Sequence, residues 1–417
     1  MTSIAIEPRT NLNSTVTIPG SKSCTARALV MAGLTKGQTV LIEPADCEDS
    51  DYMVEGLHGL GLTVVKQTGQ ITVNGAPFTQ PTHPIFIGNS GTAMRFLTAA
   101  CATLHGTVTI DGIERMRQRP IADLLKSLER WGIVASGRGG CPPVQITSTG
   151  QFGGKTSVKG DASSQYLTGL LLVAPRANSD VEIDIEGELV SKPYIDLTIA
   201  MMRERGVSAT HRGHQQFHVR ANQEYKPGTY AIEADASGAS YFLAAAAIAG
   251  GRVRVKNLSF ASEQGDAQFA RVLEKMGCKV VAGDDFIEVQ GGGALQGIDI
   301  DLNAMPDMAQ TLAIVAMFAN GRTRIRNVHN LRIKETDRIK AVVTELRKLG
   351  THAEERDDGM VIVPGTPIPA AIDTYDDHRM AMCFAMAGLR IPGVVINHPE
   401  CVRKTFPDFF TRFASLR

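Results

Sequence analysis

The chain has 417 residues, and its 43 basic and 43 acidic side chains give a formal net charge of zero. This length predicts two or three domains with ample core, and the neutral charge argues against a nucleic-acid partner. Seven cysteines without a Cys-x-x-Cys pair exclude a disulfide framework and a cysteine zinc site as organising features. The N-terminus lacks a signal-peptide pattern and no apolar run is long enough to span a bilayer. We therefore expect a cytoplasmic protein without a membrane partner.

One pattern of elements recurs six times along the chain. A polar or Gly-rich loop leads into an apolar helix and a short strand, and then a charged loop, a second helix and two closing strands follow. The first helices are expected over residues 23–34, 91–104, 163–174, 237–249, 307–319 and 378–389. The strands that follow them are expected at 39–42, 107–110, 181–184, 252–255, 323–326 and 394–397. Regular spacing of this kind indicates internal duplication.

The sixth unit stops inside its second helix, at residues 409–417, and lacks its two closing strands. The N-terminus supplies two additional strands, at 3–7 and 14–18, and we infer that they complete the sixth unit. The chain would then form two three-unit domains, residues 21–234 and residues 1–20 plus 235–417. Ligands commonly bind in the cleft between such halves. A single sheet with ordinary α/β alternation is the alternative, and it would not explain the missing strands.

Residues 330–338, Asn-Leu-Arg-Ile-Lys-Glu-Thr-Asp-Arg, precede a helix with apolar residues at helical spacing and a stop at Gly350. Lys334 and Arg338 project from one face if this turn is helical. Two cations at a helix start oppose the macrodipole, which favours anions there, so the stretch indicates an anion-binding role. The alternative is a pair of solvated charges neutralised by Glu335 and Asp337.

The loops ahead of the other helices carry most of the remaining candidate groups. If the units of a domain pack in the same sense, several helix starts face one cleft and hold an anion such as phosphate or carboxylate. The cations in these loops are Lys22, Arg27, Arg119, Lys334, Arg338, Arg379 and Lys404. Three of these loops also have simpler interpretations: Gly88 to Gly91 as a plain turn and cap, and Ser163–Ser164 and Asp307 as helix caps.

In order along the whole chain, these motifs resemble the 5-enolpyruvylshikimate-3-phosphate synthase family. The two most specific are Gly-Asn-Ser-Gly-Thr-Ala-Met-Arg at 88–95 and Arg-Ile-Lys-Glu-Thr-Asp-Arg at 332–338. Supporting motifs lie at 19–23, 162–165, 191–194, 377–381 and 404–408. The resemblance implies an α/β protein: a two-domain inside-out α/β barrel. Each domain has three βαβαββ-type units with helices in its core, and the active site lies in the interdomain cleft.

The resemblance also implies a 3-phosphoshikimate 1-carboxyvinyltransferase that acts as a monomer. Such an enzyme transfers the enolpyruvyl group of phosphoenolpyruvate to the 5-hydroxyl of 3-phosphoshikimate and releases phosphate. The step belongs to the shikimate pathway of chorismate and aromatic amino-acid biosynthesis. It needs no metal or organic cofactor, and glyphosate inhibits it. The nearest alternative is UDP-N-acetylglucosamine enolpyruvyl transferase, which usually has a reactive Cys where residues 115–119 have none. A non-enzymatic phosphate-binding module is the second alternative.

Carried over residue by residue, the resemblance assigns a role to each matching position. The expected phosphoenolpyruvate ligands are Lys22, Gly91, Arg119, Gln165, Arg338, Arg379 and Lys404. The expected 3-phosphoshikimate ligands are Lys22, Ser23, Arg27, Ser163, Ser164, Gln165, Ser191, Tyr194, Asp307, Asn330 and Lys334. Asp307 is expected to be the base on the 5-hydroxyl, and Glu335 the proton carrier at C3 of phosphoenolpyruvate, assisted by Lys22. Neighbouring cations keep a carboxylate ionised, which suits a base.

Three positions depart from the family pattern. Ser90 and Phe96 stand where the family commonly has Ala and Pro, and Ala26 stands where it commonly has Asn. Phe96 directly follows the 88–95 motif and lies about one helical turn beyond its Gly-rich loop, so it can displace Gly91 and Thr92. We predict altered sensitivity to glyphosate, which resembles bound phosphoenolpyruvate, rather than lost activity.

Overall fold

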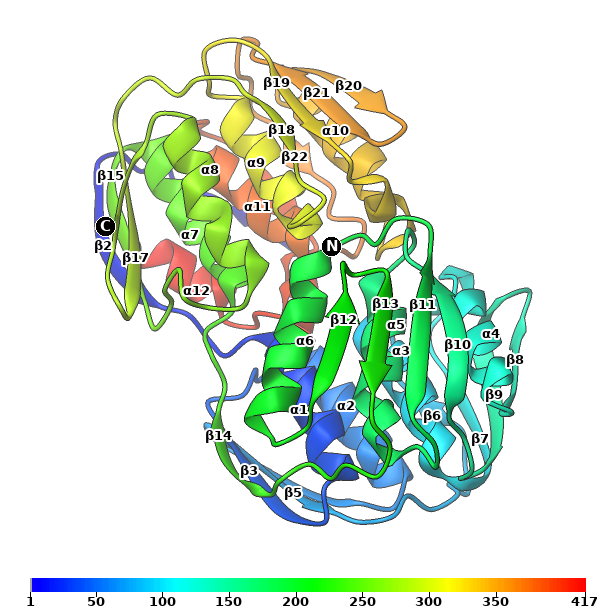
Figure 1. Ribbon diagram of the computed structural model, residues 1–417. Coiled ribbons are helices and arrows are strands. Elements are labelled where there is room, and N and C mark those ends of the chain that lie inside the picture. The colour runs from blue at the N-terminus through cyan, green and yellow to red at the C-terminus, as the bar shows by residue number, and fades with distance from the viewer. Residues whose placement is uncertain (1) are drawn as a thin grey trace. The chain divides into compact units, whose positions relative to one another are not determined.

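A computed structural model describes residues 2–417, and the chain divides into two compact units. The central unit comprises Gly20–Ile232, and the terminal unit comprises the segment up to Pro19 together with Glu233–Arg417 (Figure 1). The chain thus passes from one unit to the other twice, at Pro19 and at Ile232. In the described residues, no helix is both long and apolar enough to cross a bilayer.

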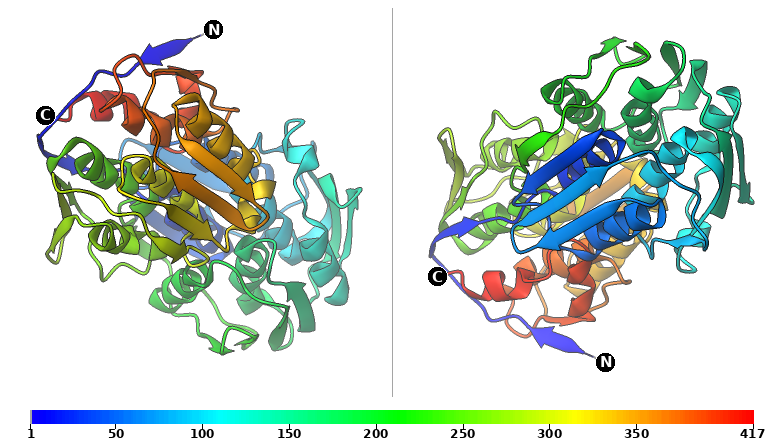
Figure 2. Two further views of the ribbon diagram at one scale, coloured as in Figure 1. Left: turned by 90° about the horizontal axis from the view of Figure 1, so that it is seen from above. Right: turned by 90° about the horizontal axis from the view of Figure 1, so that it is seen from below.

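The strands of residues 2–417 form six sheets, three in each unit (Figures 1 and 2). The central unit holds three four-stranded sheets. The first has the strand order β14 (Gly228–Ala231), β3 (Gly37–Ile42), β5 (Gln70–Gly75), β4 (Thr63–Gln67), and the second has the order β6 (Ile85–Phe86), β7 (His105–Asp111), β9 (Cys141–Thr149), β8 (Val134–Arg138). The third has the order β10 (Gly154–Lys159), β11 (Val181–Glu186), β13 (Gln216–Val219), β12 (Ala209–Arg212). The terminal unit holds two four-stranded sheets and one three-stranded sheet. The four-stranded sheets have the strand orders β16 (Lys279–Ala282), β17 (Phe286–Gly291), β15 (Gly251–Lys256), β2 (Leu12–Thr17) and β18 (Asp299–Asp301), β19 (Thr323–Arg326), β21 (Gly359–Val363), β20 (His352–Arg356). The three-stranded sheet has the order β1 (Ser3–Ala5), β23 (Val395–Asn397), β22 (Ala371–Ile372).

The first helix of each repeat is buried on every side. These core helices are α1 (Lys22–Leu34), α3 (Gly91–Ala100) and α5 (Ser164–Val173) in the central unit, and α7 (Ala236–Ala249), α9 (Ala309–Ala316) and α11 (His378–Gly388) in the terminal unit. Within each unit the three contact one another. A helix that is apolar all round must be buried, and the Ala-rich α7 illustrates this. The expected α/β fold with helices in the core of each unit is confirmed.

Polar side chains fix the starts of most core helices. Ser21, Ser90, Ser163, Asp235 and Asp377 each accept a hydrogen bond from a backbone N–H of the first turn. Such caps satisfy N–H groups that have no partner within the helix.

The second helix of each repeat follows the strand after the core helix. These second helices are α2 (Glu48–Gly59), α4 (Ala122–Arg130), α6 (Lys192–Glu204), α8 (Phe269–Lys275), α10 (Arg338–Lys348) and α12 (Phe409–Ala414).

The inference about the N-terminal strands is half right. β1 pairs antiparallel with β23, which completes the sixth unit as expected, but β2 pairs parallel with β15 of the fourth unit. The reason lies in the crossovers. A strand ahead of a core helix normally pairs parallel with the strand after it, as β6 does with β7 across α3. At the two crossings the chain changes unit, so β2 joins the sheet of β15, and β14 joins that of β3.

Candidate active site

Charged residues from four segments of the terminal unit form one buried cluster. Asp307 lies in the 3₁₀ helix η5 (Pro306–Met308), directly ahead of α9. Arg338 begins α10, Arg379 is the second residue of α11, and Lys404 ends the 3₁₀ helix η7 (Pro399–Lys404). Helix starts from two adjacent repeats therefore meet, as the packing argument expected.

The guanidinium group of Arg338 is the centre of this cluster and is 2% exposed. It donates to both carboxylate oxygens of Asp377, at 2.7 and 3.2 Å. It also donates to Asp307 Oδ1 at 3.1 Å and to Glu335 Oε2 at 2.8 Å. Burial lowers the pKa of Arg338, but the three carboxylates outweigh burial and raise it overall. Arg338 is therefore a permanent cation that holds three acids.

The two carboxylates expected to move protons share these cations. Asp307 accepts a second bond, from Arg379 Nη2 at 2.9 Å, and Glu335 Oε1 lies 4.0 Å from Lys404 Nζ. Arg379 donates in turn to the hydroxyl of Tyr241 on α7, at 3.2 Å. Two guanidinium groups bonded to one carboxylate favour its ionised form, and Asp307 has two such partners. Asp307 thus lies in an environment that suits a general base.

The 330–338 stretch is not one helical turn. Its first half forms the 3₁₀ helix η6 (His329–Ile333), Lys334 is extended, and α10 begins only at Arg338 with Asp337 as its cap. The expectation that Lys334 and Arg338 project from one helical face is therefore wrong. The reason is that the Asp337 side chain accepts a hydrogen bond from the backbone N–H of Lys340. This bond caps the helix at Asp337, so α10 begins at Arg338 and excludes Lys334.

Asn330 and Arg332 in this stretch have different environments. Asn330 is buried in η6, and its Oδ1 has no hydrogen-bond partner within residues 2–417. A buried carbonyl oxygen of this kind costs free energy until a ligand or water donates to it. Arg332 instead bonds Asp337 at 2.9 Å and Glu355 at 2.7 Å, so it stabilises the loop.

A second cluster lies at the helix starts of the central unit. Lys22 begins α1, and its Nζ lies 3.1 Å from Asp49 Oδ2 on α2. Arg27, one turn further along α1, donates to Thr198 Oγ1 at 2.8 Å and to the carbonyls of Ser23 and Tyr194 at 2.9 and 3.0 Å. Burial lowers the pKa of Arg27 to about 10. The network holds its guanidinium between α1 and α6, where Tyr194 also lies.

Gly91 provides space for an arginine. Arg119 is buried and donates to the carbonyl and the side-chain oxygen of Asn89, at 3.1 and 3.3 Å. A Cβ atom at Gly91 would lie 2.6 Å from Arg119 Nη2 and 2.5 Å from Arg95 Nη1. The absence of a side chain at Gly91 thus lets two guanidinium groups approach the N-terminus of α3.

The start of α5 joins this central cluster. Gln165 Nε2 donates to Thr92 Oγ1 at 3.2 Å, which links α5 to α3. Ser163 caps α5 by accepting from the Gln165 N–H at 3.2 Å, so the cap interpretation of Ser163 is correct, and Ser164 is the first residue of the helix. Ser191 precedes α6 in a left-handed conformation, with φ 57°. These polar groups all lie at the N-terminal ends of their helices.

The expected residues therefore divide between the two units, and each unit holds one charged cluster. Four residues without an expected ligand or catalytic role hold these cations in place. Asp49 contacts Lys22, and Asn89 accepts from Arg119. Tyr241 accepts from Arg379, and Asp377 accepts from Arg338. Asp377 and Asn89 lie within quoted motifs, so their proximity to the cations was available as a signal. Nothing in the sequence around Tyr241 distinguishes it from other aromatic core residues.

Two of the departures from the family pattern have local explanations. Ser90 caps α3 by accepting from the Ala93 N–H at 3.4 Å. Phe96 is buried in α3, and its ring centre lies 5.6 Å from the guanidinium carbon of Arg27. Phe96 therefore connects two parts of the site, because it belongs to α3, the helix that begins with Gly91, and its ring faces the Arg27 guanidinium. The structure gives no specific reason for Ala26.

Comparisons with known proteins found one family that matches nearly the whole chain. Residues 6–413 match the family described as EPSP synthase (3-phosphoshikimate 1-carboxyvinyltransferase). A 3-phosphoshikimate 1-carboxyvinyltransferase from Tolumonas auensis is 47% identical over 426 residues, covering 100% of this chain and 99% of the relative. One from Trichormus variabilis is 48% identical over 409 residues, covering 96% of each chain. An EPSP synthase structure from Acinetobacter baumannii superposes with a TM-score of 0.80 at 25% identity, covering 98% of this chain and 96% of that one.

Proposed function

Because the chain belongs to the EPSP synthase (3-phosphoshikimate 1-carboxyvinyltransferase) family, we propose that it transfers the enolpyruvyl group of phosphoenolpyruvate to the 5-hydroxyl of 3-phosphoshikimate. Inorganic phosphate is the second product, and the step serves aromatic amino-acid biosynthesis in the cytoplasm. One observation carries the proposal: Asp307 and Glu335 share the buried Arg338 guanidinium, with Arg379 and Lys404 beside them. Acids and cations in such proximity suit proton transfer on an anionic substrate.

The cations bind the substrates and stabilise the charge that develops during addition. Arg338, Arg379 and Lys404 hold phosphoenolpyruvate from the terminal unit, together with Lys22, Gly91, Arg119 and Gln165 of the central unit. Arg27, Ser23, Ser163, Ser164, Ser191, Tyr194, Asn330 and Lys334 bind 3-phosphoshikimate, and Lys22, Gln165 and Asp307 contact it as well. Guanidinium forks match phosphate and carboxylate groups in geometry as well as charge.

Two carboxylates then perform the proton steps. Asp307, kept ionised by Arg338 and Arg379, removes the proton of the 5-hydroxyl as it attacks C2 of phosphoenolpyruvate. Glu335, in its protonated form, delivers a proton to C3, assisted by Lys22. As the tetrahedral adduct breaks down, Glu335 takes back a proton from the C3 methyl group and phosphate leaves with the proton held by Asp307, which forms the enolpyruvyl double bond. A substrate phosphate that competes for Arg338 weakens its bonds to both acids and frees them to act. No metal or organic cofactor is needed.

The division of ligands between the units predicts a motion. If both units contribute ligands, we expect substrate binding to draw the two units together. Small-angle scattering of the protein, alone and with 3-phosphoshikimate plus glyphosate, measures this directly. A radius of gyration that does not fall on ligand addition would contradict closure. We also expect a monomer in the same experiment.

One assay tests the activity. Phosphate release from phosphoenolpyruvate should require 3-phosphoshikimate and should not occur with UDP-N-acetylglucosamine. The second substrate belongs to the alternative transferase, whose reactive Cys is missing from residues 115–119. Of the flanking thiols, Cys101 is buried, and burial raises its pKa to about 12, so it cannot substitute.

Two variants separate an enzyme from a phosphate-binding module. Asp307→Asn and Glu335→Gln keep the shape of each side chain and remove its charge. Turnover should fall by roughly 10²-fold or more, the scale of general acid–base catalysis, while calorimetric binding of 3-phosphoshikimate persists. Unchanged turnover in both variants would show that neither carboxylate moves a proton.

A further inference from the structure

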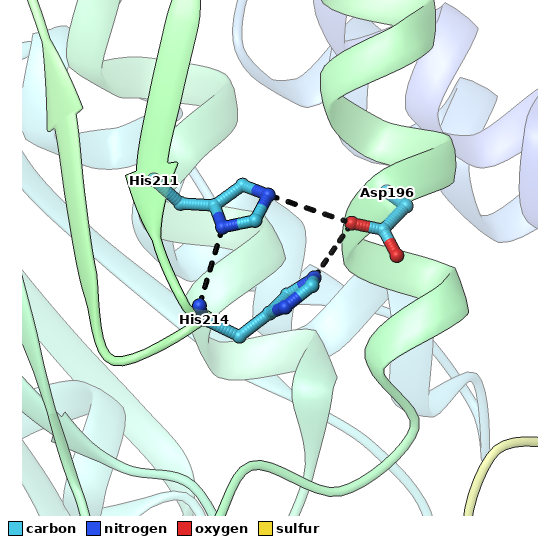
Figure 3. A group of neighbouring side chains, drawn as sticks. All are labelled: Asp196, His211 and His214. Carbon is cyan, nitrogen blue, oxygen red and sulfur yellow. Dashed lines mark hydrogen bonds and ion pairs between the residues drawn. The ribbon is translucent and has the colours of Figure 1, made fainter.

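A separate group of titratable side chains lies in the central unit (Figure 3). Asp196 is on α6, His211 is in β12, and His214 is in the loop between β12 and β13. One carboxylate oxygen and one nitrogen from each ring lie within 4.8 Å of one another. None of the three residues has a role in the proposed reaction.

The three groups converge on one point. His214 Nε2 lies 2.7 Å from Asp196 Oδ1, and His211 Nε2 lies 3.9 Å from the same oxygen. The two rings are tilted by 34°, with their centres 4.1 Å apart. Ligands bound to one zinc ion at about 2.0–2.2 Å are roughly 3.3–3.6 Å from one another in a tetrahedral arrangement. Small side-chain rotations therefore suffice to bring these three atoms into one coordination sphere.

The hairpin holds both histidines in place. Gly213 and His214 are left-handed, with φ 59° and 58°, and the Gln215 N–H closes the loop onto the Arg212 carbonyl at 3.0 Å. The His214 N–H donates to His211 Nδ1 at 3.2 Å. Both rings also lie against the buried Phe217, with centres 5.4 and 6.2 Å away. A left-handed non-glycine residue persists only where its surroundings fix it, and such residues cluster at functional sites.

We propose that Asp196, His211 and His214 bind one divalent transition-metal ion of the zinc or nickel class. Two imidazoles and one carboxylate are a ligand set that such ions prefer, and solvent completes the coordination. The side chains are 42%, 29% and 21% exposed respectively, so an ion can reach them from solvent.

Binding requires a change in the protonation of His211. Its Nδ1 accepts the His214 N–H, so in a neutral ring the proton lies on Nε2, which faces Asp196. The metal must displace that proton, and Nδ1 becomes the protonated nitrogen as its backbone bond is lost. The ion would then connect the hairpin to α6, the helix that also carries Tyr194.

The experiment uses the full chain after treatment with a chelator. Nickel is titrated by calorimetry, and the absorption spectrum of the cobalt complex identifies the ligand atoms. We expect one saturable site per chain, with affinity reduced at least about tenfold in each of Asp196→Asn, His211→Ala and His214→Ala, since each loses a ligand. His218→Ala is the matched control, because His218 lies on the neighbouring strand β13 and faces a single carboxylate, Asp180, at 3.7 Å.

Three results would overturn the site. The first is an absence of saturable binding below about 1 mM nickel. A dissociation constant above that concentration means that the binding free energy is too weak for a specific site. The second is unchanged affinity in the double variant His211→Ala/His214→Ala. The third is a cobalt spectrum with thiolate charge-transfer bands, which would place the ion at the partly exposed Cys141 or Cys401. A nitrogen–oxygen spectrum that disappears in the double variant and persists in His218→Ala supports the site.

Discussion

Arg338 and Asp377 form a fully buried ion pair, in which Arg338 Nε lies 2.7 Å from Asp377 Oδ2. The same carboxylate caps α11 by accepting the Arg379 N–H at 2.9 Å. Asp377 thus positions two of the cations assigned to phosphoenolpyruvate: Arg338 through its side chain and Arg379 through its backbone. It is a structural support for the reaction and contacts the proposed substrate only through its neighbours.

Replacing Asp377 with Ala should destabilise the terminal unit. Removing one partner of a buried ion pair costs about 3–5 kcal/mol, because the remaining charge stays buried. Urea unfolding measures the change, and Asp377→Asn should lose less because it can still cap the helix. The control is Asp408→Ala, which breaks the exposed Arg412–Asp408 pair and should change little. An unfolding midpoint for Asp377→Ala equal to that of the wild type would contradict this account.

Gly91→Ala should weaken phosphoenolpyruvate binding without unfolding the protein. The new Cβ would lie 2.6 Å from Arg119 Nη2, so the guanidinium must move, whereas alanine favours the helix itself. Loss of one charged hydrogen bond costs about 1.5–3 kcal/mol, so KM for phosphoenolpyruvate should rise roughly ten- to hundredfold. Steady-state kinetics measure this rise. Gly238→Ala, whose Cβ meets its nearest atom at 3.4 Å, is the matched helical control, and an equal KM in both variants would refute the argument.

Phe96 should affect both glyphosate inhibition and the second substrate. Comparing the glyphosate inhibition constant of the wild type with that of Phe96→Pro tests the first effect, and equal values would refute it. Phe96→Leu tests the second, because it removes the ring 5.6 Å from the Arg27 guanidinium and keeps an apolar side chain. A cation–π contact contributes about 0.5–2 kcal/mol, so KM for 3-phosphoshikimate should rise by a few fold. An unchanged KM would mean that Arg27 does not depend on the ring.

Glu288 should make stability depend on acid pH. It accepts bonds from Gln290 at 2.7 Å, Arg254 at 2.8 Å and Arg252 at 3.1 Å. Burial raises the pKa of Glu288, but the bonds from Gln290 and Arg254 outweigh burial and lower it below its ordinary value of 4.5. Its stabilisation is therefore present above pH 4.5 and is lost as the pH falls through the lower folded value.

The corresponding measurement compares the wild type with Glu288→Gln in urea across this pH range. The variant should be less stable at pH 7, and the difference should shrink below pH 4.5. A difference that stays constant with pH would show that the charge of Glu288 contributes nothing.

Tyr375 should support the loop that carries Asp377. Tyr375 and Asp376 are both left-handed, with φ 54° each. The Tyr375 hydroxyl donates to the buried carboxylate of Glu345 at 2.7 Å, and the Asp373 N–H donates to the same group at 3.1 Å. Glu345 lies on α10, the helix that begins with Arg338, so one helix holds the loop at two points.

Tyr375→Phe removes the hydroxyl and leaves the ring. We expect a loss of about 1–3 kcal/mol in stability from the less satisfied carboxylate, and a moderate rise in KM for phosphoenolpyruvate through Arg379. Denaturant unfolding and kinetics together measure both effects. A loss of stability with an unchanged KM would limit the role of Tyr375 to the loop itself.

The repeated units, the buried helices and most of the helix starts could be predicted from the amino-acid sequence. These features depend on local composition: an apolar run such as that of α7 must be buried on all sides, and Ser21 or Asp377 caps whichever helix follows it. The motifs at 88–95 and 332–338 also carried the family resemblance, because each keeps its polar residues in one short segment.

Which of these segments meet could be learned only from the folded chain. The pairing of β2 with β15, the convergence of Asp307 and Asp377 on Arg338, and the grouping of Asp196 with His211 all join residues that are distant in the chain. Local propensity fixes where a helix starts but not which other helix start it will face. That choice depends on how the buried faces pack, and the packing brings the charges together.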